Sequence, residues 1–146
     1  MSRLAIYESK VFRVIFAGLS LGDGRADPFF KITANGPAYV IEGPGADGQM
    51  TRCGTNNNGY VITLGFKGTS SEHAKLSAIH IADRLASNGA GVAPLMCQDD
   101  NGSTLITTDR AWLTGMPEQA HGITKNDVEW ELHAVIEPGG FILGGN

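Results

Sequence analysis

The sequence lacks the features that most often mark a binding or catalytic site. Its 11 lysine and arginine residues form no basic run, and the formal net charge is -4. Nucleic-acid-binding surfaces carry clustered positive charge, so the charge pattern argues against phosphate recognition. Charged residues also interrupt positions 1–16, which excludes a signal-peptide core or a membrane span in that segment. We therefore expect a soluble chain that does not contact a membrane.

Cysteine and histidine are too sparse and too widely spaced to predict a metal centre. Cys53 and Cys97 lack the paired spacing of a zinc site and cannot form the dense disulfide framework of a small secreted domain. We expect both to be reduced thiols that pack as small hydrophobic groups. No two histidines have the four-residue helical spacing that favours a shared metal; they are His73, His80, His121 and His133. The sequence predicts no metal and no cofactor.

Residues 43–48 fit the GxGxxG pattern of dinucleotide-binding loops, but the segment after them does not. In that motif the tight turn opens directly into a helix whose N-terminal amides hold a pyrophosphate. Here residues 49–59 read QMTRCGTNNNG, which is a poor helix sequence. A glycine-rich loop is the better interpretation. No serine or cysteine has the context of a catalytic nucleophile either, so we predict that the protein is not an enzyme and has no catalytic residue.

What the sequence does contain is a series of short alternating segments separated by glycine-rich junctions. In residues 60–67 and 128–136 apolar and polar side chains alternate, which predicts strands with one buried face. Glu129, Glu131 and His133 share the polar face of the second strand, where a solvated face is favoured over an acid/base or metal site. Shorter strands are predicted at 11–17, 28–33, 38–42, 92–98 and 103–108, with a tight hairpin turn at Asn101-Gly102 between the last two.

One helix is predicted, from Ser70 to about Ser87. Thr69 and Glu72 have the spacing of a capping box, and Asn88-Gly89 offers a left-handed stop. An apolar stripe predicts that the helix lies on a sheet with these residues facing the core; they are Ala74, Ala78, Ile81, Ala82 and Leu85. The opposite, solvent-facing side is predicted to carry Ser77, His80 and Arg84.

The predicted fold is mainly β (α+β): an antiparallel β-sandwich or partly closed barrel with one α-helix packed on it. The strands are short and turn-linked, and no strand-helix-strand rhythm repeats. At 146 residues the chain fits a single domain over 1–146. Two connections, 18–27 and 43–59, are long for so small a domain. Loops of this length are usually functional or are ordered by a partner, which here could be another copy of the chain.

The order of motifs along the chain resembles a known family. Gly22-Asp-Gly24 comes first, then GADG at 45–48, an arginine, and a Thr-Asn stretch ending at Gly59. The alternating strand and the capped helix TSSEHAKLSAIHIAD come next. An Asp-Asn-Gly hairpin, Ala111-Trp112 and the strand VEWELHAV before GGN complete the series. From about residue 11 to 146 this order is similar to the tail tube proteins of contractile-tailed bacteriophages, which are related to the tube proteins of type VI secretion systems and pyocins.

The resemblance implies a tail-tube-like fold and a structural function. Six copies would form a ring, and rings would stack into a hollow tube, the conduit for genome ejection inside a contractile sheath. The partners would be other copies of the chain and the sheath, baseplate and terminator proteins, with DNA passing through the lumen without specific binding. The protein would assemble in the host cytoplasm and reside in the virion tail. Barrel closure between copies would pair strand edges that a lone monomer leaves open.

Two sets of residues are expected to serve this assembly. An acidic lumen would repel phosphate and let DNA slide, and the lumen-facing candidates are Glu129, Glu131 and Glu137. The same strand could instead face the sheath side or another subunit. Residues 43–59 form the candidate inter-subunit arm, by their length and their position in the family; the candidates are Gly43, Pro44, Gly45, Asp47, Arg52, Asn56, Asn57 and Asn58. The alternative is a mobile surface loop.

Two other functions are left open by the sequence. The tube could belong to a pyocin or a type VI-like contractile injection device, which genomic neighbourhood and not sequence would distinguish. From a different class, a β-sandwich module could bind a small ligand or glycan with Trp112 or Trp130 as a stacking platform. Trp130 lies on the apolar face of its strand, which favours the core for that side chain.

Overall fold

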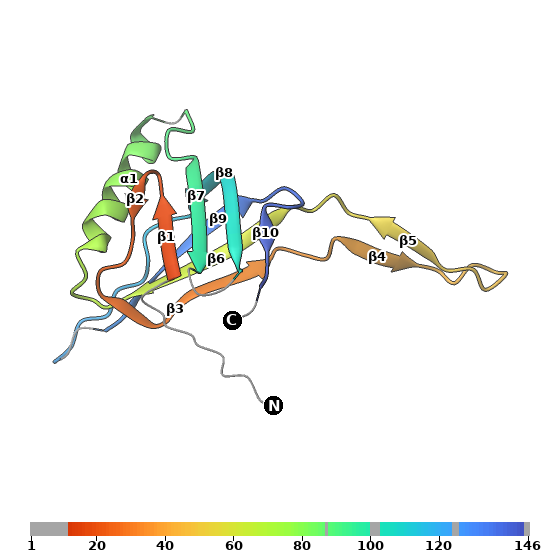
Figure 1. The fold of residues 1–146 in the computed structure, drawn as a ribbon, viewed down its shortest axis with the longest axis horizontal. Helices are drawn as coiled ribbons and strands as arrows, with labels where there is room; N and C mark the ends of the chain where they lie inside the picture. The colour runs from red at the N-terminus through yellow and green to blue at the C-terminus, as the bar shows by residue number, and fades with distance from the viewer. Residues whose placement is uncertain (1–11, 87, 100–102, 124–125, 145–146) are drawn as a thin grey trace.

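The computed structural model describes residues 12–86, 88–99, 103–123 and 126–144, which form ten strands and one helix (Figure 1). The elements are β1 (Phe12–Phe16), β2 (Leu19–Ser20), β3 (Arg25–Ala34), β4 (Tyr39–Glu42), β5 (Thr51–Gly54), β6 (Gly59–Phe66), α1 (Glu72–Ala86), β7 (Ala93–Asp99), β8 (Leu105–Leu113), β9 (Val128–Val135) and β10 (Phe141–Ile142). All strand pairs are antiparallel. The predicted class, β-rich with one helix, is confirmed.

Eight strands form one sheet in the order β2-β1-β7-β8-β9-β6-β3, with β10 paired to the beginning of β8. Strand β8 joins two halves of this sheet, because its first residues pair with β7 and β10 while Ala111 to Leu113 pair with β9. The sheet folds over on itself around a single hydrophobic cluster. The largest side chains in that cluster with almost no exposure include Trp130, Phe16, Phe66 and Leu21.

The β1 side and the β3 side of the folded sheet approach each other without pairing. The rings of Phe12 on β1 and Phe30 on β3 lie 4.9 Å apart between centroids. No backbone ladder joins β1 to β3 in the described residues, so the barrel stays open along this line, which we call the seam. The predicted sandwich or partly closed barrel is therefore confirmed in its partly closed form.

The alternating strands are confirmed with the predicted faces. Ile62, Leu64 and Phe66 on β6 are buried, as are Val128, Trp130, Leu132 and Ala134 on β9. β7 and β8 pair as a hairpin would, but the Asn101-Gly102 turn predicted between them lies outside the described residues. The sequence missed the two-residue strands β2 and β10, the strand β5, and the extension of β8 to Leu113. The 18–27 connection contains β2, a turn at 23–24 and the beginning of β3.

The helix forms where predicted, but the face assigned to the core was wrong. Its buried residues are Glu72, Leu76 and His80, whereas Ala74, Ala78, Ile81, Ala82 and Leu85 are all exposed. Leu76 is the only large aliphatic side chain of the helix that joins the core cluster, with Ile79 packed at its margin. The apolar stripe therefore faces away from the sheet.

The start of the helix is held by different residues from those predicted. Ser70 Oγ accepts the N–H of Glu72 at 3.2 Å, and Asp23, from the turn before β3, accepts both the N–H of Ser71 at 3.2 Å and its hydroxyl at 2.8 Å. These bonds satisfy N–H groups that have no partner inside a helix, in place of the predicted Thr69 cap. At the other end Gly89 has φ 78°, the left-handed stop that the sequence indicated.

Candidate assembly surfaces

Strands β4 and β5 form a separate two-stranded hairpin that projects from the body of the molecule (Figure 1). We call residues 38–55 the arm. The last backbone bond of the β3–β6 pair at its base is from Asn35 N–H to the Gly59 carbonyl, 2.9 Å. The arm begins with a bond of the same length from Thr55 N–H to the Ala38 carbonyl. It is thus a distal continuation of the β3–β6 hairpin, with its own ladder.

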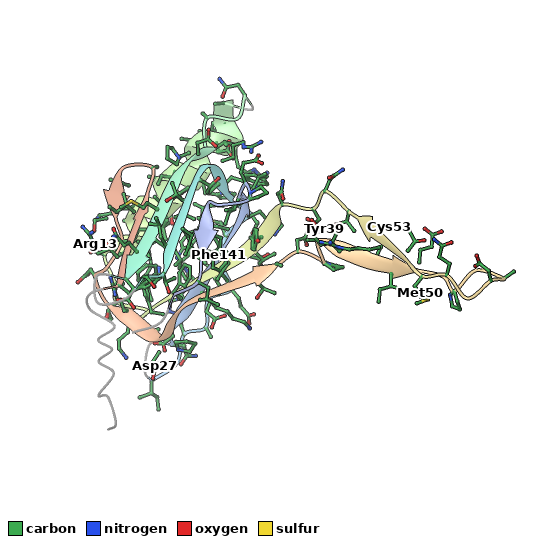
Figure 2. All side chains as sticks on the ribbon, turned by 45° about the vertical axis from the view of Figure 1, so that its right-hand side comes forward. Arg13, Asp27, Tyr39, Met50, Cys53 and Phe141 are labelled. Atoms are coloured by element: carbon green, nitrogen blue, oxygen red, sulfur yellow. The ribbon has the colours of Figure 1, made fainter. Side chains whose placement is uncertain are left out.

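The arm has apolar side chains on both faces and no core to bury them. Register places Tyr39, Ile41 and Arg52 on one face and Val40, Glu42 and Cys53 on the other. Ile41 is 75% exposed and Met50 54%. Figure 2 shows Tyr39, Cys53 and Met50 on the projecting hairpin, away from the body. An isolated two-stranded hairpin is marginally stable in water, so these exposed apolar groups indicate a surface that a partner covers.

Short contacts within the arm hold several of its side chains. The Arg52 guanidinium carbon lies 3.6 Å from the centroid of the Tyr39 ring, a cation–π contact. On the other face the Cys53 Sγ donates to Glu42 Oε2 at 3.4 Å. These pairs stiffen a hairpin that has no hydrophobic core, which favours a preformed arm over a mobile loop.

The tip of the arm explains the glycine pattern at 43–48. Gly45 N–H donates to the Gln49 carbonyl at 3.0 Å, and Gln49 N–H donates to Asp47 Oδ1 at 3.0 Å. Gly43 has φ 119°, and a Cβ there would lie 2.8 Å from the Gln49 carbonyl oxygen. Glycine is therefore required by the turn itself. The strand β5 follows this turn, where a dinucleotide-binding motif would have a helix.

The three asparagines predicted for the arm lie at its base. Asn57 Oδ1 accepts the N–H of Gly59 at 3.1 Å, and the Asn58 carbonyl accepts the N–H of Ile136 at 2.9 Å. Asn56 has φ 54°, a conformation that asparagine tolerates better than most residues. The Asn58 bond ties the base of the arm to the residue that follows β9. Of the predicted arm residues, Gly43, Pro44, Gly45, Asp47 and Arg52 are on the projecting part.

The three predicted lumen carboxylates all lie on the exposed side of the β9 region, in different surroundings. Glu129 and Glu131 are exposed on β9, opposite Gly65 and Thr63 of β6. Glu131 Oε1 lies 3.1 Å from His133 Nε2. Glu137, beyond the strand, forms an ion pair with Arg110 of β8. The face is acidic at Glu129 and Glu131 and locally neutralised at Glu137.

The sequence reading missed a third surface, on the outward side of α1. Ala74, Ala78, Ile81 and Leu85 lie along this side, and Met116 from the β8–β9 connection lies beside Ile81 and Leu85. We call these five residues the helix patch. Leu85 is 82% exposed, Met116 55% and Ile81 53%. The apolar stripe at 74–85 is the sequence signal for this surface, and a stripe alone does not distinguish a core-facing side from an exposed one.

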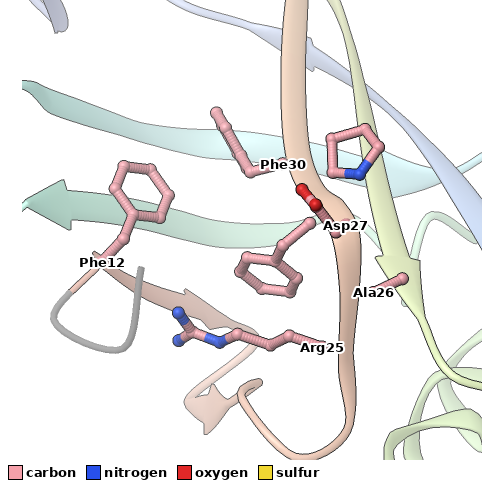
Figure 3. A pocket seen from close by; sticks show the side chains of 7 residues that line it. Phe12, Arg25, Ala26, Asp27 and Phe30 are labelled. Carbon is pink, nitrogen blue, oxygen red and sulfur yellow. The ribbon is translucent and has the colours of Figure 1, made fainter. Parts of the chain in front are cut away.

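A cavity of about 660 Å³ opens at the seam, lined by Phe12, Phe29, Phe30, Arg25, Ala26, Asp27 and Pro28 (Figure 3). The β3–β6 register shifts between Arg25 and Phe30, so this part of β3 bulges. The Arg25 guanidinium stacks on the Phe29 ring, 4.3 Å from the centroid. A bulge, a proline and charges are the devices that protect a strand edge from pairing with another strand.

The remaining candidate groups are structural. Trp130 Nε1–H donates to His73 Nδ1 at 3.0 Å, and His73 Nε2 lies 2.8 Å from the Lys67 carbonyl, so the hydrogen is on Nε2. Trp130 is therefore a core residue and not a stacking platform. Cys97 is buried, and burial raises the pKa of its thiol to about 12. Across the described ranges no group of three or more His, Cys, Asp or Glu side chains could hold a metal ion.

Comparisons with known proteins give a similar phage sequence and a similar fold. No protein-family model matches the chain. The chain is similar to "Structural protein ORF10" of Pseudomonas phage KPP10, with 28% identity over 88 residues. That match covers 60% of this chain and 51% of the phage protein, so the chain aligns with about half the length of that relative.

Among solved structures, the fold is similar to the cryo-EM structure of the anti-feeding prophage cap, a tube-terminating cap. The TM-score is 0.54 over 92% of this chain and 90% of the cap chain. Identity is 14%, so the likeness concerns the fold alone. In the part of the chain that the structure describes, no helix is both long and apolar enough to span a membrane.

Proposed function

We propose that this protein is a structural subunit of a contractile tail, and that copies of it form hexameric rings that stack into the tail tube of a phage. The observation that carries the proposal is the arm. It is a preformed hairpin whose Tyr39, Ile41 and Met50 are exposed, on a body that already has a complete core. Such a hairpin is explained when a second copy covers it. The likeness to a phage structural protein and to the fold of a tube-terminating cap supports the same class.

In the proposed tube, DNA passes through a lumen lined by the exposed face of β9, including Glu129, Glu131 and Glu137. Carboxylates on that face would keep the phosphate backbone from adhering. The sheath, baseplate and terminator proteins are the proposed further partners. The proposed location of the protein is the tail of the virion, which it reaches after assembly in the host cytoplasm. The proposed activity is assembly and not catalysis.

Arm deletion tests the assembly directly. Residues 38–55 are replaced by a short glycine-containing link between β3 and β6, which are already paired at Asn35 and Gly59. We expect the full chain to form rings or tubes in negative-stain micrographs and fast-sedimenting species. The chain without the arm should sediment as a monomer, and its unfolding temperature should equal that of the full chain in its monomeric form. A full chain that stays monomeric at high concentration and low salt would refute the proposal.

The lumen is tested by charge reversal. Glu129→Lys with Glu131→Lys should leave assembly intact, since both side chains are exposed, but tubes should then retain a labelled DNA oligonucleotide in a salt-sensitive way. Tubes of the unmodified chain are the control. DNA retention by the double variant that does not exceed that of the unmodified tubes would argue against the β9 face as the lumen.

A second role in the same class is favoured by the structural comparison. The similar fold belongs to a cap that terminates a tube, and a cap-like subunit would form single rings where a tube subunit forms stacks. The same micrographs distinguish the two. A tube of a pyocin or type VI-like device is the remaining alternative, and the genes beside this one would identify it.

A further inference from the structure

We propose that the helix patch is the docking surface for the arm of a neighbouring copy of this chain. This inference rests on the proposed function, since it names the surface through which one subunit holds the next. It assigns a role to the apolar stripe of α1, which the fold leaves uncovered.

The helix patch is a continuous apolar surface that the chain itself does not cover. The small residues Ala74 and Ala78 form a flat lane, and Ile81, Leu85 and Met116 rise at its end. A shallow cavity of about 250 Å³ lies there, lined by Ile81, Leu85, Met116 and the side chains of His80 and Arg84. It is large enough to take an aliphatic side chain such as the exposed Ile41 of the arm.

The arm cannot reach the helix patch of its own chain. Figure 1 places α1 at one end of the long axis of the molecule and β4 and β5 at the other. A contact between them therefore joins two different copies, and each copy offers one arm and one patch. Repeated head-to-tail contacts of this type close into a ring or continue as a filament. This is the symmetry that a tube requires, and a two-fold dimer would not need it.

The charges around the two surfaces are also compatible. Arg84 lies at the edge of the helix patch, and Glu118 is two residues beyond Met116. The arm carries Glu42 and Asp47 towards its tip and Arg52 in the middle of its ladder. Each surface thus has positive and negative side chains around an apolar centre, an arrangement typical of protein interfaces.

The seam cavity is a less suitable receptor for the arm. Phe12 and Phe29 there are each only 8% exposed, so a partner would cover little new apolar surface. The bulge and Pro28 also prevent a regular strand pairing along this part of β3. Docking at the seam is nevertheless a distinct outcome that an experiment can detect.

Cross-linking through the native Cys53 tests the proposal. Cys53 is on the face of the arm opposite Ile41, so a bismaleimide cross-linker needs a spacer long enough to pass the edge of the two-stranded hairpin. Cys97 is buried with its pKa raised to about 12, so the reagent reacts with the arm thiol alone. In Leu85→Cys each chain gains a second thiol on the helix patch. We expect a ladder of covalent dimers, trimers and higher species on a denaturing gel. Asp27→Cys, with a thiol at the seam, is the matched control and should give no ladder.

The outcomes separate the inference from the proposed function. A ladder with Asp27→Cys and none with Leu85→Cys would overturn the helix patch as receptor while leaving assembly in place. Cys53→Ser combined with Leu85→Cys should abolish the ladder, because the arm thiol is then missing. If sedimentation shows only monomers of the unmodified chain, the proposed function fails as well.

A variant without cross-linker gives an independent readout. Leu85→Ser should weaken assembly at least about tenfold, seen as a shift of the sedimentation profile towards monomer, with no change in the unfolding temperature of the monomer. Ile142→Ser removes a half-exposed aliphatic residue of β10 that belongs to neither the arm nor the helix patch, and it should leave assembly unchanged. Equal effects of the two substitutions would contradict the inference.

Discussion

Two isoleucines show how differently the body and the arm are built. Ile62 on β6 is fully buried between β3 and β9, while Ile41 on β4, in the hairpin that extends from the same β3–β6 pair, is 75% exposed. The body holds its aromatic and aliphatic side chains in one cluster. The arm has strand pairing and no core. The core therefore accounts for the stability of the body, whereas the exposed apolar side chains of the arm are accounted for only by a surface of another molecule that covers them.

The isoleucine pair gives the largest expected difference. Ile62→Ala should lower the free energy of unfolding by about 2–5 kcal/mol, because it leaves a cavity in the core. Ile41→Ala should change it by less than about 0.5 kcal/mol, because the side chain is mostly in water already. Denaturant titration of both variants under monomeric conditions measures the two values. Similar losses would mean that the arm packs against the body in solution, and the comparison would fail.

Gly65 tests how tightly the body is packed beneath the β3 bulge. A Cβ at this position would lie 2.7 Å from the Pro28 carbonyl oxygen, so Gly65→Ala forces the backbone to move. We expect a loss of about 1–3 kcal/mol in the free energy of unfolding. Gly115→Ala is the control, since nothing lies within 4 Å of a Cβ there. An equally small effect of both would show that the bulge is loosely held.

His73 tests the contact between the helix and the core. His73→Phe keeps an aromatic ring but leaves the buried Trp130 N–H without an acceptor, which should cost about 1–3 kcal/mol. His121→Phe, at an exposed histidine, should fall within about 0.5 kcal/mol of the unmodified chain. Thermal unfolding followed by tryptophan fluorescence measures both. No difference between the two would remove the hydrogen bond from the account of helix docking.

Asp23 gives the smallest effect and a pH dependence of known sign. Two hydrogen bonds lower the pKa of this carboxylate from the ordinary value of 3.8: the larger effect comes from the Ser71 hydroxyl and the smaller from the Ser71 backbone N–H. The stabilisation is therefore present above that pH and is lost as the pH falls through the lowered pKa of the folded state. Asp23→Asn should unfold at a slightly lower temperature than the unmodified chain at pH 7, and the gap should close in acid. A gap independent of pH would exclude the charge as its cause.

The sequence predicted those parts of the fold in which local pattern and tertiary environment agree. β6 and β9 lie side by side in the sheet with one face in the core, so their period of two was read correctly. The class of fold followed from these strands and the single helix. β2 and β10 have only two residues each, too short for any pattern, and depend on β1 and β8 for their pairing.

The helix shows why the rest could not be predicted. A stripe of apolar residues indicates that a helix buries a face, but it does not say against which molecule. The face of α1 that packs on its own sheet uses Leu76 with Glu72 and His80, which a hydrophobic pattern does not select. The stronger stripe, with Ile81 and Leu85, stays exposed. Length and glycine content are local signals, and they predicted an arm at 43–59, whereas the projecting hairpin spans 38–55. The sequence predicted the strand β4 and missed β5. Contact of the arm with another subunit remains a prediction.

The position of β1 determines when the chain can become competent to assemble. Arg13 on β1 donates to Gln98 on β7, a residue 85 positions later. Within the described ranges, the only other strand paired with β1 is the two-residue β2. During synthesis the arm is complete once residue 55 has been made, long before β7 exists to pair with β1. Pairings between such distant segments form slowly. The order of synthesis therefore favours folding of nearly complete chains first and ring formation afterwards, because an early arm has no finished neighbour on which to dock.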